Sequence, residues 1–517
     1  MIPCSKLRRL THSDAGNRHT DWASLDQDLV ELVGFRVLAG DLQDYVWFRA
    51  VCSHWRASTV RPCGRGVLDP RFYPRRWMML PEGHGLHPGH PDLGGFVRFF
   101  NLDTGAFARA HLPLLVDHVI LDSVDGLLLL HHNDDTTIRL LHPFTGDVAE
   151  FPPLASLLPQ MERSSYNERT KRYMLMKVCA SVTVSSSGAI TLVLALDLLH
   201  RVAYATAGDQ SWSLSAWKLK PFLKPVSFQG KLYALQLTSV DIGKLYIYQF
   251  NPPCPDSGDG QSRLPLPVKI AECPKHKICF VLHFVECCSE LLLVSYNDVS
   301  RSKLLVYRLA DLVSGKIEPL TDIGDHTLFI GDRSLCVSLS PNKGSRTRSF
   351  TSMSPNSIIC MHTFSDPYSE FARFEQYDLS TGNWTPASDG DVFQRPPPSP
   401  HTLIHHIFTS CKYSFWKYMA AWRRRDDRHK PPFDSPPFCR TQKEPVPVST
   451  TNLVTDLMLV LNCHAVIYYY TFLYDSGGMH AQEVNGRGLP ARGSDVACCA
   501  AARIRSRIVM RSPAGLY

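Results

Sequence analysis

The first pattern in the chain is helical and lies in residues 21–58. Ser24 is followed three residues later by Gln27, which is the form of a capping box, so the sequence predicts a first helix that begins near Leu25. Apolar positions then recur at helical spacing, with acidic residues between them, at Leu25, Leu29, Leu32 and Val33. One face of this helix is therefore predicted to be apolar and the other polar.

A second and a third helix are predicted directly downstream. Gly40 interrupts the pattern, and Asp41 is the expected N-cap of the next helix. The apolar stripe resumes at Leu42, Tyr45, Val46 and Phe48 and continues into Val51, Cys52 and Trp55. A short third helix is expected to carry Trp55.

From about residue 65 to residue 400 the pattern changes to short apolar runs separated by Gly, Pro, Asn and Asp, which indicates β-strands. One recurring unit is a strand, a tight turn ending in Ser/Thr-Gly and a second strand, at 99–107, 140–148, 306–317 and 375–384. Glycine suits such a turn because it adopts positive φ freely. A second unit has Gly just ahead of a strand, at 123–131, 227–235 and 329–339.

Repeated strand-turn-strand units without crossover helices favour a closed radial β array. We predict a mainly β protein with a β-propeller, and at about 40–50 residues per blade the span holds six or seven blades. A tandem pair of β-sandwich domains would give a similar pattern of turn residues between strands, and it is the alternative to the propeller.

The helical segment resembles the F-box, the motif that docks a substrate receptor onto the Skp adaptor of a cullin-type (SCF) ubiquitin ligase. The residues that carry the resemblance are Leu25, Leu29, Leu32, Leu38, Leu42, Val51, Cys52 and Trp55. The resemblance implies that these residues bind the adaptor. The departure is Asp26, where most F-boxes have Pro in the first helical turn. An ordinary helical hairpin that covers a core is the competing interpretation.

The body resembles a plant domain of unknown function that follows an F-box and is thought to be a kelch-like propeller. The resemblance extends from about Asp21 to His406 and includes VDGLLLL, SFQGKLYAL and FEQYDLSTGNWTPASD. It implies a substrate-recognition subunit of a ubiquitin ligase, in the nucleus or cytoplasm, that captures an unknown target protein and performs no catalysis. A non-ligase scaffold or small-ligand binding protein with a degenerate F-box is the alternative.

The distribution of charge and of cysteines argues against several classes of function. Residues 411–517 hold 15 Lys and Arg against 8 Asp and Glu, so residues 1–410 hold 40 of each. A neutral body argues against nucleic acid as a partner. The 16 cysteines include no Cys-x-x-Cys pair, and the adjacent pairs Cys287-Cys288 and Cys498-Cys499 have poor geometry for tetrahedral zinc. We expect free thiols, no structural metal, and no secretion signal.

The common catalytic signatures are absent from the sequence. His84, His87 and His90 are interpreted as a solvated turn, and Asp134-Asp135 and 389–391 as hairpin tips. In the pairs His131-His132 and His405-His406, strand alternation predicts one residue inward and one outward. We expect no catalytic residue, no metal and no cofactor. A sugar-processing propeller enzyme is the third option, and a carboxylate-lined central pocket would reveal it.

The expected organisation is a disordered segment at 1–20, the helical module at 21–60, the propeller at 65–406 and a disordered tail at 411–517. In the tail, 423–430 is interpreted as a solvated charge run. Residues 453–473 are long enough to cross a bilayer, but Asp456, Asn462 and His464 count against membrane insertion.

Overall fold

The computed structural model describes residues 22–80, 95–161, 171, 175–196, 200–218, 222–237, 244–253, 264–274, 279–297, 302–331, 333–339, 353–363, 371–393, 403–404, 407 and 411. The chain divides into two compact units, Met1–Lys430 and Pro431–Tyr517, and all described residues belong to the first. The predictions for residues 1–20, for the histidines at 84–90, for His405-His406 and for the tail beyond Cys411 lie outside the described residues. Among the described residues, no helix is both long and apolar enough to cross a membrane.

The chain begins with the predicted helices. They are preceded by a 3-10 turn, and their bounds are η1 (Trp22–Ser24), α1 (Gln27–Gly40), α2 (Leu42–Ala50) and α3 (Ser53–Ala57). The predicted capping box is wrong, because Ser24 belongs to the 3-10 turn and Asp26 caps α1 by accepting the backbone N–H of Asp28 at 2.9 Å. An aspartate carboxylate at this position also favours the positive end of the helix dipole.

The second cap is confirmed. Asp41 precedes α2 in an extended conformation, and its Oδ1 accepts the backbone N–H groups of Gln43 at 2.7 Å and Asp44 at 3.3 Å. The turn between α1 and α2 is therefore fixed by a single carboxylate.

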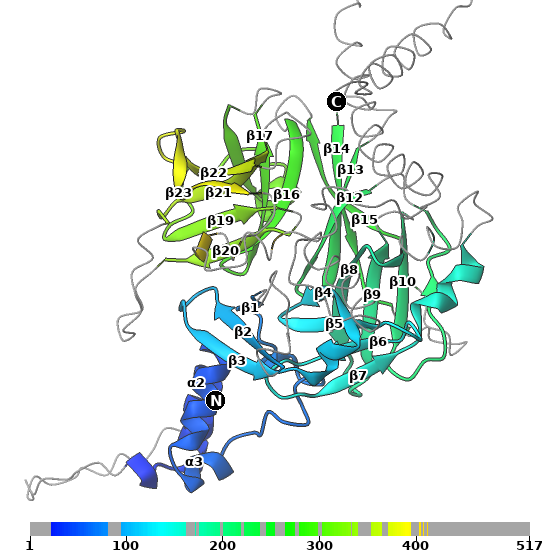
Figure 1. The fold of residues 1–517 in the computed structure, drawn as a ribbon, viewed down its shortest axis with the longest axis vertical. Helices are drawn as coiled ribbons and strands as arrows, with labels where there is room; N and C mark the ends of the chain where they lie inside the picture. The colour runs from blue at the N-terminus through cyan, green and yellow to red at the C-terminus, as the bar shows by residue number, and fades with distance from the viewer. Residues whose placement is uncertain are drawn as a thin grey trace, which may run out of the picture. The chain divides into compact units, whose positions relative to one another are not determined.

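The described strands form six sheets, which are the six blades of a β-propeller (Figure 1). Blade 1 holds β1 (Trp77–Met79), β2 (Phe96–Asn101) and β3 (Phe107–His111). Blade 2 holds β4 (His118–Val124), β5 (Leu127–His132), β6 (Ile138–Leu141) and β7 (Val148–Phe151). Blade 3 holds β8 (Val178–Val184), β9 (Ile190–Leu196), β10 (Arg201–Thr206) and β11 (Ser213–Leu214).

Blades 4 to 6 follow in chain order. Blade 4 holds β12 (Phe222–Phe228), β13 (Lys231–Leu237), β14 (Lys244–Phe250) and β15 (Val268–Pro274). Blade 5 holds β16 (Cys279–Cys287), β17 (Glu290–Tyr296) and β18 (Leu304–Arg308). Blade 6 holds β19 (His326–Ile330), β20 (Leu335–Ser338), β21 (Ser357–Thr363), β22 (Phe371–Asp378) and β23 (Trp384–Phe393). Short helical turns connect strands at η4 (Pro113–Val116) and η5 (Leu154–Gln160), and η2 (Pro70–Phe72) lies between α3 and β1.

Buried apolar clusters join each blade to the next and close the ring. Five clusters follow chain order, between blades 1 and 2, 2 and 3, 3 and 4, 4 and 5, and 5 and 6. The sixth returns to the start, because Met78 and Phe100 of blade 1 pack with Phe329 and Ile359 of blade 6. A continuous circle of interfaces is the property of a propeller, which rules out the tandem sandwich.

The local turn predictions are largely confirmed. The turns at 99–107, 140–148 and 375–384 each connect antiparallel strands, and Gly105, Gly146 and Gly382 take positive φ. The prediction for 306–317 is wrong, because the helix α5 (Leu309–Val313) follows β18 there. Leu309 and Leu312 lie at helical spacing, and both are buried against blades 4 and 5. Packing therefore selects a helical turn over a second strand.

The middle of the ring is lined by one strand from each blade. Among these innermost strands, β4 contacts β8, β8 contacts β12, β12 contacts β16 and β16 contacts β20. In blade 6 the innermost strand is β20, and its antiparallel partner β19 pairs in parallel with β21. This arrangement brings segments that are distant in the sequence to a common centre.

Candidate functional site

The helical module, which comprises η1 and α1 to α3, is attached to blade 1 by Asp41. Its Oδ2 accepts the indole Nε1–H of Trp77 and the amide Nδ2–H of Asn101, both at 2.8 Å. Leu38, Leu42 and Tyr45 pack with Phe72 in a separate apolar cluster. Figure 1 shows α2 beside β2 and β3. The module and the propeller therefore share both a polar anchor and an apolar contact.

The segment that follows the helices is also tied to blade 2. Asp147, in the turn between β6 and β7, accepts the backbone N–H of Gly64 at 2.8 Å and that of Gly66 at 2.6 Å. His142 donates its Nε2–H to the carbonyl of Phe72 at 2.9 Å, and its Nδ1 accepts the backbone N–H of Thr145 at 3.0 Å. Burial lowers the pKa of His142, so the ring is neutral at pH 7.

The structure sorts the eight residues predicted to bind an adaptor by their exposure. Leu38 and Leu42 are buried in the contact with Phe72, so they attach the module to the rest of the protein. Leu25, Cys52 and Trp55 are half-buried. Trp55 stacks on Phe48 with ring centroids 4.4 Å apart. The exposed members of the predicted set are Leu29, Leu32 and Val51.

The exposed apolar residues of the module are more numerous than the sequence indicated. We call them the outer helical face: Trp22, Leu29, Leu32, Val33, Val46, Trp47 and Val51. They are seven of the fifteen large hydrophobic residues exposed in the described part of the chain. Four of them were missing from the predicted site: Trp22, Val33, Val46 and Trp47. Trp47 gave a signal that could have been used, since a large aromatic residue outside the buried stripe of a helix has no core to fill.

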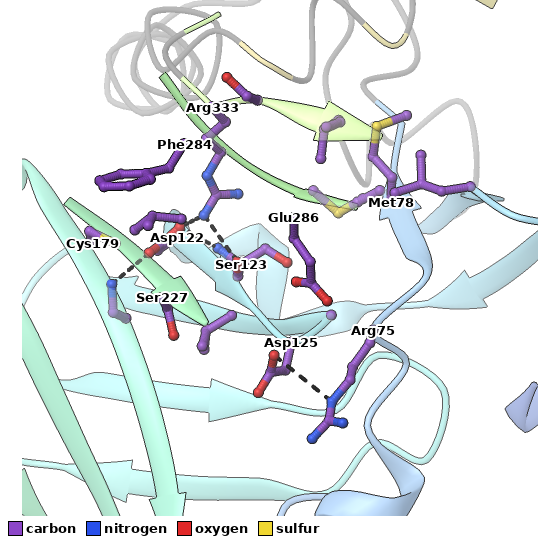
Figure 2. Close-up of a pocket in the computed structure, with 18 of the residues that line it drawn as sticks. Arg75, Met78, Asp122, Ser123, Asp125, Cys179, Ser227, Phe284, Glu286 and Arg333 are labelled. Carbon is purple, nitrogen blue, oxygen red and sulfur yellow. Dashed lines mark hydrogen bonds and ion pairs between the residues drawn. The ribbon is translucent and has the colours of Figure 1, made fainter. Parts of the chain in front are cut away.

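A second candidate site is a cavity of about 210 Å³ at the centre of the ring. All six blades or their inner ends contribute to its wall, at Arg75, Asp122, Cys179, Ser227, Glu286 and Arg333 (Figure 2). No sequence motif predicts this pocket, because its lining comes from segments that are distant in the sequence. Its lining contains the carboxylates that were expected of a sugar-processing propeller enzyme.

Two ion pairs connect charged groups that line the cavity. Arg333 forms an ion pair with Asp122 and donates to the carbonyl of Ser123 at 3.1 Å. Asp122 Oδ2 also accepts the backbone N–H of Ala180 at 2.7 Å. Arg75 lies 3.9 Å from Asp125, measured from Nε to Oδ1. Figure 2 shows both ion pairs across the cavity. These pairs join blades 1, 2, 3 and 6 around the centre.

Glu286 and Asp125 differ from ordinary surface carboxylates. Glu286 lies on β16 and its side chain extends into the cavity (Figure 2). The side chain is exposed to the solvent of the cavity, although the other blades surround it. Burial raises the pKa of Glu286, and the nearby charge of Asp125 raises it further. Burial also raises the pKa of Asp125, against the opposing effect of Arg75. Such a pair can hold a proton or a cation more readily than isolated acids can.

On the far side of the cavity, a lysine faces a histidine. The Nζ of Lys224 lies 2.9 Å from Nε2 of His283. Burial, followed by the positive charge of Lys224, holds the pKa of His283 well below its usual value. The ring is therefore neutral at pH 7. Lys224 has φ of 46° and lies at a bulge in the pairing of β12 with β13. Its placement thus depends on a locally strained backbone.

The predictions for the histidines and acids of blade 2 are confirmed where the structure describes them. His131 is buried and His132 is partly exposed, as alternation along β5 requires. Asp135 lies in the turn after β5, where its Oδ1 accepts the backbone N–H of Thr137 at 2.9 Å. Asp389 and Asp391 fall within β23, so they are not a hairpin tip as predicted.

Comparison with solved structures gives the following likenesses. The fission yeast SREBP-SCAP binding domains match at 10% identity and TM-score 0.20, over 54% of this chain and 60% of that one. An exo-β-1,3-galactanase from Phanerochaete chrysosporium matches at 10% identity and TM-score 0.21, over 48% of this chain and 59% of that one. Drosophila Plexin A in complex with Semaphorin 1b matches at 8% identity and TM-score 0.24, over 55% of this chain and 80% of that one.

The chain thus spans about 60% of the length of the first two of these structures. Likenesses of this size identify neither a ligand nor an activity. No curated protein matches the chain. The model of one family, described as the KIB1-4 beta-propeller, matches residues 99–385, which is more than half of the chain and extends from blade 1 into blade 6. The chain belongs to the KIB1-4 β-propeller family.

Proposed function

We propose that this chain is the substrate-recognition subunit of a cullin-type ubiquitin ligase, in the nucleus or cytoplasm. In this proposal the helical module is an F-box that binds a Skp-type adaptor, and the propeller captures a target protein. The subunit performs no bond chemistry itself. Its contribution is to hold a target near an activated ubiquitin, which raises effective concentration and orients the reacting groups.

The observation that supports this proposal is the outer helical face. Seven large apolar side chains are exposed on about thirty residues, while Leu38, Leu42 and Tyr45 already fill the contact with the propeller. An exposed apolar patch of this kind marks a protein interface. Burying one Leu or Val of the face in a partner would contribute on the order of 1.5–3 kcal/mol.

The attachment of the module supports the same function. Asp41 holds Trp77 and Asn101 while it caps α2, so the outer helical face has a fixed orientation relative to blade 1. A fixed orientation suits a receptor, because it limits the positions that a captured target can take relative to the activated ubiquitin. The adaptor-binding module and the target-binding propeller of the proposed receptor are therefore held in a fixed relative orientation.

The test is co-purification with a Skp-type adaptor. We expect the double variant Leu29→Asp, Leu32→Asp to lose the adaptor, because two charges would have to be desolvated in the interface. The matched control is Leu266→Asp, since Leu266 is 70% exposed and lies outside the module, whereas Leu32 is 65% exposed within it. Leu42 is unsuitable for this test because it is buried, and a charge there would unfold the module.

The outcomes separate the alternatives. Loss of the adaptor from the double variant but not from Leu266→Asp supports the proposal, provided that both fold. A wild-type chain that folds and recovers no adaptor would refute it and would favour a scaffold with a degenerate F-box.

The central cavity favours a second candidate function, the binding of a small polar ligand. Glu286 and Asp125 offer carboxylates and Lys224 offers a cation within one pocket. The volume of about 210 Å³ is below the range of about 300–1,000 Å³ that is common for ligand pockets, so only a ligand of a few atoms would fit. A screen of small polar ligands by thermal shift, repeated on Glu286→Gln, tests this function. A shift that Glu286→Gln abolishes would support it.

A further inference from the structure

Three cysteines and a histidine meet at the interface of blades 5 and 6. Cys287 ends β16, Cys288 follows it in the turn to β17, His326 begins β19, and Cys336 lies in β20. The ligand atoms of Cys287, His326 and Cys336 all lie within 4.8 Å of one another. Figure 1 shows β16 beside β19 and β20. The sequence argued against zinc at Cys287-Cys288, because an adjacent pair alone has poor geometry for tetrahedral coordination; the structure adds Cys336 and His326 from blade 6.

We propose that this cluster is a structural Zn²⁺ site, with Cys287, Cys336 and His326 as its core ligands. Cys288 lies beside Cys287 and His326 but outside that group of three, and it would complete the coordination by moving its side chain toward the ion. Thiolate and imidazole donors are the set that zinc prefers in structural sites. A tetrahedral zinc with Zn–S bonds of about 2.3 Å holds its sulfur ligands about 3.8 Å apart. The Sγ atoms of Cys287 and Cys336 are 3.3 Å apart and those of Cys287 and Cys288 are 4.0 Å apart, which brackets that spacing.

The histidine is already oriented as a metal ligand. Its Nδ1 lies 2.9 Å from the carbonyl oxygen of Ile323, and because a carbonyl oxygen only accepts, Nδ1 carries the proton. The lone pair therefore belongs to Nε2, which lies 3.1 Å from the Sγ of Cys288. A ligating histidine is typically held by such a bond from its other nitrogen to a backbone carbonyl.

The surroundings suit a site of this charge. Cys287 and Cys336 are buried in the apolar cluster between blades 5 and 6, whereas Cys288 is exposed, so an ion can enter from one side. Three thiolates and one Zn²⁺ carry a net charge of −1, and each thiol that binds releases its proton to solvent. Arg76, which is paired with Asp103, lies near the site, with its Nη2 3.5 Å from the carbonyl oxygen of Cys336.

A zinc at this position would fasten blade 5 to blade 6. The turn after β16 has two consecutive residues at positive φ, Cys288 at 50° and Ser289 at 62°. Blade 6 also makes the closing contact with blade 1, where Ser338 donates its backbone N–H to the carbonyl of Leu102 at 2.9 Å. The site would therefore hold in place the blade that closes the ring.

The test compares the zinc content of full-length variants purified with a reductant and without chelators. The chain has 16 Cys and 22 His, so the total zinc content alone does not locate the ion. We expect the wild type to contain one zinc per chain more than Cys336→Ser. The matched control is Cys360→Ser, since Cys360 is buried in the same cluster but is not part of the site, and it should keep the wild-type content.

Two further variants keep the test decisive if Cys336→Ser does not fold. His326 is only half-buried, and His326→Gln should lower the affinity for Zn²⁺ by at least about tenfold. Cobalt substitution of the wild type should give a thiolate-to-cobalt absorption band, and Cys288→Ser should weaken it. Equal zinc content in the wild type and both core variants would overturn the proposal. A disulfide between Cys287 and Cys336 in a chain alkylated during lysis would also overturn it, in favour of a redox pair.

Discussion

The carboxylate of Asp41 lies 2.8 Å from the indole Nε1 of Trp77, and the same carboxylate caps α2. One side chain thus caps the first turn of α2 and holds the helical module on blade 1. Because Trp77 is buried, its N–H has no water to replace the lost acceptor if Asp41 is removed.

The first prediction concerns this anchor. We expect Asp41→Ala to lower the free energy of unfolding by at least about 2.5 kcal/mol, because the cap is worth about 0.5–2 and each of the two buried donors left unpaired, on Trp77 and Asn101, costs about 1–3. Asp26→Ala is the matched control, since Asp26 caps α1 in an exposed position, and it should cost only about 1 kcal/mol. Urea unfolding measures both. Equal losses would contradict a special role for Asp41.

The second prediction concerns the turn between β4 and β5. Gly126 has φ of 82°, and a Cβ there would lie 2.0 Å from the carbonyl oxygen of Pro74. We expect Gly126→Ala to cost at least about 3 kcal/mol, from both strain and collision. Gly146→Ala is the control, because its φ of 75° is similar but nothing lies within 4 Å. It should cost about 1–2 kcal/mol. Thermal unfolding that ranks them in the reverse order would refute the described packing.

The third prediction concerns the central cavity. Arg333→Ala would leave the buried carboxylate of Asp122 without its ionic partner, and we expect a loss of about 3–5 kcal/mol in stability. The comparison is Arg308→Ala, which removes a surface pair with Glu290 at 3.0 Å and should cost less than about 1 kcal/mol. Chemical denaturation of the two variants gives both values. Similar losses would mean that the cavity pair is as solvated as the surface pair.

The fourth prediction concerns pH. The pKa of His142 is lowered by burial, so the unfolded chain binds a proton more readily than the folded one just below pH 6.5. Stability that is present above pH 6.5 is therefore lost as the pH falls through the depressed folded pKa. We expect His142→Gln to reduce this loss between pH 7 and pH 5, because an amide makes both hydrogen bonds without titrating.

The wild type and His142→Gln should be compared at each pH. Asp125 and Glu286 have raised pKa values, so they act in the opposite direction, with stability falling as pH rises from about 3.8 and about 4.5 respectively. Their contribution cancels in the difference between the two proteins. An unchanged pH profile would exclude His142 as the titrating group.

The sequence predicted features whose cause is local. Asp41 and the turn glycines Gly105 and Gly146 act on backbone within a few residues, so capping and turn chemistry identified them. The error at Ser24 has the same origin, because Asp26 is a competing cap two positions away. The helix at Leu309–Val313 was missed since its choice over a strand depends on burial against blades 4 and 5.

The sites that the sequence did not predict are assembled from distant segments. Asp122 and Arg333 meet only when blades 2 and 6 are placed around one centre. Cys287 and Cys336 meet only because β20 lies innermost in blade 6. No spacing rule connects such residues, because their separation follows from the ring and not from a turn or a helix.

The circle of six apolar clusters has a consequence for truncation. In a linear array, removing the last unit uncovers one surface. Here, a chain cut before β19 would uncover two, the flank of blade 5 around Val294 and the flank of blade 1 around Phe100. Such a fragment would expose two apolar surfaces, and we expect it to self-associate rather than to fold as a smaller propeller.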